Sequence, residues 1–137
     1  MRFSPAAIAL SLSFAMISSA SISGRADDDI DPQSTALLKS GQDAMKAGKT
    51  EDAIGWYETA LAVDPRNRAA YIAMAEAVQK QGLNGKAIRF YKEALEIDPN
   101  DQIALGGQAE AMIAKGAIEP ARKNSARLKM RCRRDCG

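Results

Sequence analysis

Cys132 and Cys136 are the two cysteines of the chain and the residues best suited to do chemistry. In an ideal helix their C-x3-C spacing would place the α-carbons roughly 6 Å apart, at the upper end of the disulfide range. Three interpretations stay open: a disulfide within one chain, free or intermolecular thiols, and redox or metal chemistry. The spacing is not the C-x-x-C of thiol oxidoreductases, which disfavours redox chemistry. We expect a disulfide that closes a short terminal loop.

The chain of 137 residues contains no histidine. This absence excludes Ser-His-Asp and Cys-His nucleophiles, imidazole metal ligands and His-ligated haem. Two cysteines are also too few for a Cys-only zinc site in one molecule. We therefore expect a protein that is not an enzyme, with no catalytic residues, no metal and no cofactor. A thiol-based enzyme is the remaining catalytic alternative.

The first 26 residues have the features of a signal peptide. Arg2 precedes an uncharged apolar run from Ala6 to Ile17, which is too short to span a membrane. Small residues allow cleavage after Ala20 or after Ala26, and the sequence does not choose between them. We expect an exported protein, periplasmic or secreted, which is also why we expect the cysteines to be oxidised. Residues 27–33 are expected to form a flexible acidic leader.

Charge is divided unevenly along the remaining chain. Residues 27–121 hold 10 basic and 16 acidic side chains, whereas residues 122–135 hold seven basic and one acidic. One interpretation of this basic tail is a solvent-exposed helix whose Lys and Arg side chains stabilise the negative end of its dipole. Contact with an acidic surface or a membrane is another. We expect no nucleic acid partner, because no aromatic residue interleaves the basic ones to stack on bases.

Residue types recur at a fixed offset of 34 positions through the middle of the chain. The recurring sets are Gly48, Gly82 and Gly116; Ala53, Ala87 and Ala121; Tyr57 and Tyr91; Ala60 and Ala94; Leu61 and Leu95; and the dipeptides Asp64-Pro65 and Asp98-Pro99. A constant period of this length predicts a repeat protein. Taking proline as the thirty-second position sets the units at 34–67, 68–101 and 102–135.

Each unit has the pattern of two helices. Apolar residues at steps of three and four predict one buried stripe per helix. The repeated glycine should end the first helix in a left-handed conformation, and Asp-Pro should end the second. The predicted helices cover 35–47, 50–63, 68–81, 84–97, 102–115 and 118–130. The sequence thus predicts an all-α solenoid whose units bury their apolar faces against their neighbours.

These units resemble the tetratricopeptide repeat, which has small residues at positions 8, 20 and 27, an aromatic residue at 24 and proline at 32. The first two units follow this pattern. The third is degenerate, since Ser125, Leu128 and Arg133 stand at positions 24, 27 and 32. The resemblance implies an α-α superhelix of about three repeats over residues 34–131, followed by a Cys-containing basic tail at 132–137. Many such proteins carry a solvating helix after the last unit; whether the tail, a second copy or further sequence covers this end stays open.

The resemblance implies a non-catalytic protein-protein interaction module, and the signal-peptide pattern leads us to expect it in the cell envelope. Such a module binds a protein or peptide segment in the concave groove of the solenoid, but the fold does not name the partner. The alternative is a structural accessory subunit that assembles through its uncapped C-terminal repeat or its basic tail.

The same resemblance places the groove on fixed positions of each first helix. The residues carried over are Leu38, Gln42, Met45, Ile72, Glu76, Gln79, Ile103, Glu110 and Ile113. The family's basic clamp for a C-terminal carboxylate is not expected, because its positions hold none of the required Lys, Asn or Arg. They hold Leu38, Gln42, Ala73, Ile103 and Gly107 instead.

An apolar strip with two carboxylates remains on these positions. The strip consists of Leu38, Met45, Ile72, Ile103 and Ile113. Glu76 and Glu110 lie one unit apart, so the groove should suit an apolar or amphipathic segment that carries Lys or Arg. The alternative is that these residues face a shallow groove or contact the protein's own leader.

Overall fold

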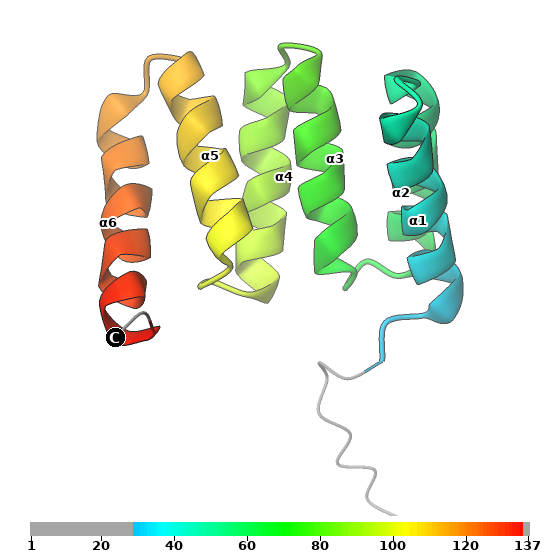
Figure 1. Cartoon of the computed structure of the whole chain (residues 1–137), viewed down its shortest axis with the longest axis horizontal. Coiled ribbons are helices and arrows are strands. Elements are labelled where there is room, and N and C mark those ends of the chain that lie inside the picture. Colours follow the sequence, from blue (N-terminus) through cyan, green and yellow to red (C-terminus); the bar gives the residue numbers. More distant parts are fainter. Residues whose placement is uncertain (1–28, 136–137) are drawn as a thin grey trace, which may run out of the picture.

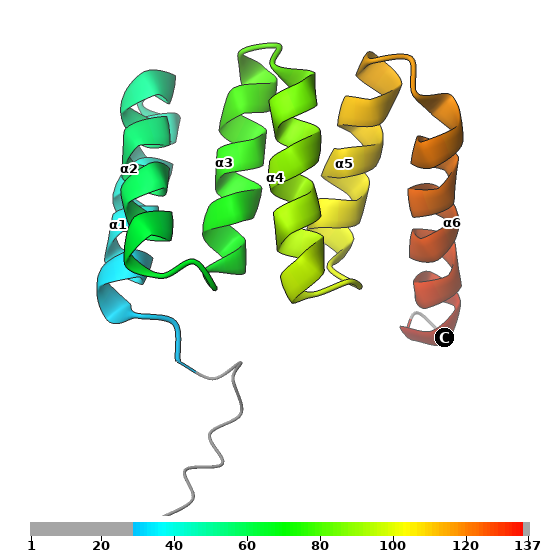
Figure 2. The same ribbon diagram turned by 180° about the vertical axis from the view of Figure 1, so that it is seen from behind.

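The computed structural model describes residues 29–135, without the side chains of Cys132, Arg134 and Asp135. This part of the chain folds into six helices that stand in chain order from one end of the molecule to the other (Figures 1 and 2). The helices are α1 (Pro32–Lys46), α2 (Thr50–Val63), α3 (Arg68–Lys80), α4 (Asn84–Ile97), α5 (Gln102–Ala114) and α6 (Ile118–Asp135). They pack as the pairs α1–α2, α3–α4 and α5–α6, which confirms the all-α repeat architecture.

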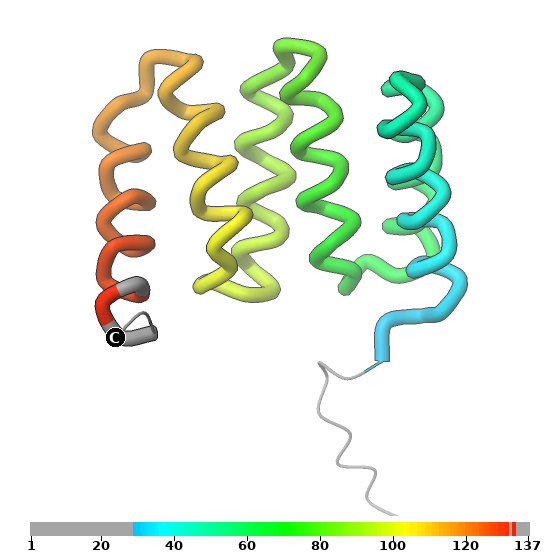
Figure 3. The backbone as a smooth tube through the Cα atoms, in the orientation of Figure 1, coloured from blue at the N-terminus to red at the C-terminus, as the bar shows by residue number. Residues whose placement is uncertain are grey.

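A glycine in the left-handed region ends the first helix of every pair. Gly48, Gly82 and Gly116 have φ angles of 76°, 77° and 77°. The amide of the residue after each glycine then bonds back into the helix, as the Lys49 amide does to the Ala44 carbonyl at 2.9 Å. Only glycine adopts this conformation without a steric penalty, so these residues define the tight turns traced in Figure 3.

Two helices are longer than the sequence predicts. α1 begins at Pro32 because Asp31 caps it, its carboxylate accepting a 2.7 Å hydrogen bond from the Gln33 amide. α6 continues to Asp135, beyond the predicted end at 130. In the first two repeats Asp-Pro stops the second helix, and the third repeat has Arg133 in place of that proline.

The described part of the predicted flexible leader makes specific hydrogen bonds. The Asp31 amide donates to Asp64 Oδ2 at 2.9 Å, and the Arg66 guanidinium donates to the Asp29 carbonyl at 3.0 Å. Pro32 and Gln33 already belong to α1. Residues 29–33 are therefore fastened to the turn between α2 and α3. The structure thus moves Pro32 and Gln33 from the predicted flexible leader into α1.

The core lies between the paired helices and between neighbouring pairs. Tyr57 and Tyr91 are each only 2% exposed, and the alanines of positions 20 and 27 are fully buried in the first two repeats. Buried polar groups are satisfied by one another. Ser34 Oγ donates to the Ala60 carbonyl and accepts from Asn67 Nδ2, both at 2.8 Å. Because Asn67 also caps α3, these hydrogen bonds tie α1 and α2 to the start of α3.

The first helices of the repeats lie closer together than the second helices do. Among the described residues α1 contacts α3 and α3 contacts α5, whereas α2, α4 and α6 make no contact with one another. The stack therefore curves so that α1, α3 and α5 line its inner, concave side.

Candidate binding groove between the first helices

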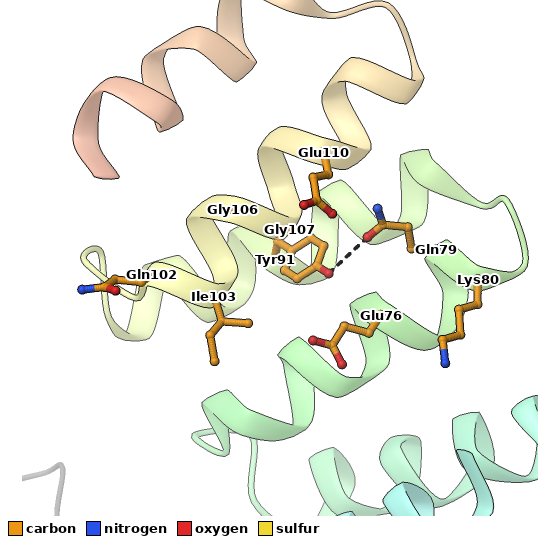
Figure 4. Close-up of a pocket in the computed structure, with 9 residues that line it drawn as sticks. All are labelled: Glu76, Gln79, Lys80, Tyr91, Gln102, Ile103, Gly106, Gly107 and Glu110. Atoms are coloured by element: carbon orange, nitrogen blue, oxygen red, sulfur yellow. Dashed lines mark hydrogen bonds between the residues drawn. The ribbon is translucent and has the colours of Figure 1, made fainter. Parts of the chain in front are cut away.

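A cavity of about 550 Å³ opens on the concave side between α3 and α5. Its walls are α3 and α5, and one side chain of α4 reaches it between them (Figure 4). The lining residues are Glu76, Gln79, Lys80, Tyr91, Gln102, Ile103, Gly106, Gly107 and Glu110. The site is an open cleft between repeats two and three, large enough to take side chains of a bound segment.

Tyr91 forms the floor of this cavity. Its ring is buried, and its hydroxyl donates a 3.1 Å hydrogen bond to Gln79 Oε1 on α3. On the other side the ring lies so close to Gly107 that a Cβ atom there would overlap it. Gly107 therefore lets α5 approach α4, and this close approach fixes the Tyr91 hydroxyl at the base of the groove.

Two carboxylates, Glu76 on α3 and Glu110 on α5, flank the Tyr91 hydroxyl (Figure 4). Burial raises the pKa of Tyr91 to about 12, and the negative charges of both glutamates add to this shift. Among the described side chains neither carboxylate is in an ion pair within 4.0 Å. The cavity therefore presents two carboxylates that form no described ion pair, with Lys80 as the one cation in its lining.

The walls of the groove exclude part of the water around the Glu76 carboxylate, although the side chain is exposed. Loss of solvent raises its pKa from the ordinary value of 4.5, and the nearby Lys80 partly opposes this shift. A cation brought into the cavity would restore the stabilisation that water no longer supplies. The electrostatics thus favour a positively charged ligand group.

The exposed apolar surface of the groove lies on α5. Ile103 is 62% exposed and borders the cavity, and Ile113 is 54% exposed on the same helix. Exposed branched side chains of this size lose contact with water when a partner covers them. Ile103 thus gives the cavity an apolar rim beside its carboxylates.

Leu38 and Ile72 are not part of an exposed strip, which corrects their assignment to the groove surface. They are only 8% and 9% exposed and belong to the hydrophobic core, where burial of their side chains stabilises the packing of the repeats. Met45 packs partly against the same core. Family positions describe which side of a helix a residue occupies, but the depth of burial depends on the neighbouring helices.

The structure brings four of the nine predicted groove residues into the cavity. These are Glu76, Gln79, Ile103 and Glu110. Gln42, Met45 and Ile113 do not line it. Sequence reasoning missed Tyr91 and Gln102. From the sequence, Tyr91 at position 24 is predicted to pack between units, and its ring does so. Nothing in the sequence shows that its hydroxyl reaches the groove.

The predicted disulfide and signal peptide lie outside what the structure describes. The side chain of Cys132 and all of Cys136 are outside it, as are residues 1–28. Among the side chains that the structure describes in residues 29–135, no group of three His, Cys, Asp or Glu could hold a metal ion. No helix in that range is both long enough and apolar enough to cross a membrane.

Comparison with known proteins agrees with this geometry. A family model described as tetratricopeptide repeat matches residues 38–102. No curated protein matches the sequence significantly. Residues 38–102 include the end of the first repeat's first helix, all of α2 to α4 and the first residue of α5, so the match covers the part of the chain in which the period is most regular.

Solved structures share the fold at low sequence identity. The second TPR domain of Spaghetti (RPAP3), bound to the HSP90 peptide SRMEEVD, is 22% identical with a TM-score of 0.70, over 72% of this chain and 92% of that one. The first TPR domain of human RPAP3 is 23% identical with a TM-score of 0.67, over 70% and 76%. MamA is 20% identical with a TM-score of 0.70, over 76% and 57%.

The fold and the concave cleft define an all-α solenoid of helix-turn-helix repeats. Residues 38–102 match the tetratricopeptide repeat family, and the six described helices, packed as helix-turn-helix pairs, are consistent with three such repeats.

Proposed function

We propose that this protein is a non-catalytic interaction module of the cell envelope that binds a protein segment in its concave groove. The observation that carries the proposal is the cavity between α3 and α5, with two carboxylates and an exposed isoleucine around a buried tyrosine. Repeat solenoids of this class offer such concave surfaces to partners. The Spaghetti domains with a bound HSP90 peptide support peptide binding on this fold.

The chemistry of the groove selects the kind of segment. A Lys or Arg side chain between Glu76 and Glu110 would make charge-assisted hydrogen bonds to carboxylates that have no fixed partner. A neighbouring apolar side chain would cover Ile103. The groove should disfavour acidic segments, because the cavity already carries negative charge. The location in the envelope rests on the signal-peptide pattern of residues 1–26.

Self-assembly as a structural subunit has less support. It would need the outer face of α6 to bind another repeat, and that face carries Arg122 and Lys129 where the other repeats have isoleucine and leucine.

A peptide array tests the proposed groove. Nine-residue peptides in which a central Lys or Arg precedes Leu or Ile would be compared with the same peptides carrying Glu in place of the base. The best binder would then be titrated calorimetrically into wild type, Glu76→Gln/Glu110→Gln and Ile103→Asp. Each charge-assisted contact is worth about 1.5–3 kcal/mol, so the double variant should lose at least tenfold in affinity.

Ile118→Asp is the matched control for Ile103→Asp. Ile118 is 47% exposed at the start of α6, outside the groove, so the same change there should leave affinity unchanged. Binding that is equal for the basic and the acidic peptides, or equal in all variants, would show that this groove is not the binding site.

A further inference from the structure

The outer faces of the second helices differ between the repeats. On α2 and α4 the positions that face the next repeat are apolar, and on α6 the equivalent positions are basic or small. The equivalent sets, 34 residues apart, are Ile54, Ile88 and Arg122; Tyr57, Tyr91 and Ser125; and Leu61, Leu95 and Lys129.

The second helix of each of the first two repeats packs against the following repeat, α2 against α3 and α4 against α5. Tyr91 of α4 packs against Gly107 of α5, and the carbonyl of Ile88 accepts a 3.1 Å hydrogen bond from Gln108 Nε2. Leu61 and Leu95 are partly buried against the core. This face of a second helix is therefore a helix-binding face in this molecule.

On α6 the same face is open to solvent. Among the described helices α6 packs against α5 alone, at one end of the stack (Figures 1 and 2). Arg122 and Lys129 are exposed, and Arg133, one turn further on, is exposed as well. Ser125 Oγ bonds within its own helix, to the Ala121 carbonyl at 3.2 Å. We call Arg122, Ser125, Ala126, Lys129 and Arg133 the basic face of α6.

The helix dipole accounts for Arg133, which lies in the last turn of α6, but neither the dipole nor solubility accounts for Arg122 and Lys129. A solvent-exposed end of the stack needs polar side chains, and a mixture of positive and negative charges favours solubility more than charges of one sign. The dipole favours bases in the last turn of a helix, but Arg122 lies in the second turn of α6, near the positive end. Arg122 forms an exposed ion pair with Glu119 at 3.2 Å, whereas no ion pair of Lys129 or Arg133 is found among the side chains that the structure describes.

We propose that the basic face of α6 is a docking surface for an acidic helix of a partner protein, separate from the concave groove. The position is one that a helix occupies in both other repeats. Ser125 and Ala126 are small and lie between the basic residues, so a helix backbone has room to approach. Arg122, Lys129 and Arg133 follow at steps of seven and four residues, or about 10 and 6 Å along the helix. Glutamates at the same steps on a partner would face them.

Two designed peptides test this proposal on the full chain. Both are alanine-based helices of equal length with three glutamates, spaced by seven and four residues in the first and by five and five in the second, which scatters them around the helix. Fluorescence anisotropy at low salt should show at least fivefold tighter binding of the first peptide. Arg122→Glu/Lys129→Glu should abolish this preference.

Matched variants separate this surface from net charge and from the groove. Lys39→Glu/Lys49→Glu makes the same charge change at exposed residues of the first repeat and should keep the preference. Ile103→Asp should also keep it, whatever that variant does to groove binding. Circular dichroism melts confirm that each variant is folded. Equal binding of the two peptides, or equal loss in both double charge variants, overturns the proposal.

Two further outcomes would assign the face to another occupant and likewise overturn the proposal. In one, the protein sediments with phosphatidylserine vesicles, Arg122→Glu/Lys129→Glu abolishes this sedimentation, and the first peptide binds no more tightly than the second. The face would then be a lipid site. The other outcome is a homo-oligomer, seen by analytical ultracentrifugation, that the same variant dissociates.

Discussion

The ring of Tyr91 on α4 lies directly against the backbone of Gly107 on α5. This contact joins the second repeat to the third and also sets the floor of the groove. It depends on a missing side chain, because a Cβ atom at residue 107 would overlap the Tyr91 ring. Packing between repeats and the shape of the candidate site therefore depend on the same pair of residues.

Gly107→Ala should destabilise the protein although it improves helix propensity. Overpacking at the Tyr91 ring costs about 1–3 kcal/mol, against a gain of about 1 kcal/mol from replacing glycine in a helix. Gly106→Ala is the matched control, because a Cβ there meets nothing within 4 Å, and it should stabilise by up to about 1 kcal/mol. Urea denaturation measures both. A stabilised Gly107→Ala variant would contradict the close contact.

Ile72→Asp and Ile103→Asp should have different effects on stability. Ile72 is only 9% exposed and lies in the core, so an unpaired carboxylate there should cost at least about 3 kcal/mol. Ile103 is 62% exposed, and its change should stay within about 1 kcal/mol. Thermal melts followed by circular dichroism distinguish the two. Similar melting temperatures for both variants would be inconsistent with the described burial.

Acid should destabilise the fold through Asp64. Its pKa is lowered from 3.8 to about 2, first by hydrogen bonds from the Arg66 side chain and then by the amides of Asp31 and Arg66. The unfolded chain therefore binds the proton at higher pH than the folded chain does. The stabilisation is complete above about pH 4 and is lost as pH falls toward 2.

Asp64→Asn should reduce this loss of stability between pH 4 and 2. Urea midpoints from pH 2 to 7 measure it, with Asp43→Asn, an exposed aspartate on α1, as the control. The assignment to Asp64 fails if both variants keep the steep acid dependence of the wild type.

Groove binding of a basic peptide should weaken at mildly acidic pH. The pKa of Glu76 is raised by loss of solvent, so its carboxylate takes up a proton at a pH above 4.5 and stops attracting a cation. Affinity should therefore fall as pH is lowered through that range, and Glu76→Gln should flatten the curve. Calorimetric titrations at several pH values provide the measurement, and a pH-independent affinity in the wild type would argue against a role for Glu76.

Export and the terminal disulfide can be checked by mass. The mature chain should begin at Ser21 or Asp27, since these residues follow the two acceptable cleavage sites. Alkylation without reductant should leave Cys132 and Cys136 unmodified within one chain. A purified envelope protein that retains Met1, or that takes up two alkyl groups, would contradict these expectations.

The period of 34 residues was enough to predict the repeats, because each repeat is stabilised by short-range features that the sequence displays directly. Gly48, Gly82 and Gly116 end the first helices as predicted, with φ angles of 76° to 77°. Asp-Pro ends α2 and α4 for the same kind of local reason. Local steric rules fix these boundaries whatever the neighbouring repeats do.

The tertiary structure decided whether each side chain on the concave side is buried or exposed. Leu38 and Ile103 both occupy predicted groove positions, yet one is in the core and the other is exposed. The sequence by itself determined the period of 34 residues, the helices of each repeat and the pair of glutamates one unit apart. Only the packing of α4 against α5 placed the Tyr91 hydroxyl between those glutamates, because that arrangement depends on how closely two helices of different repeats approach.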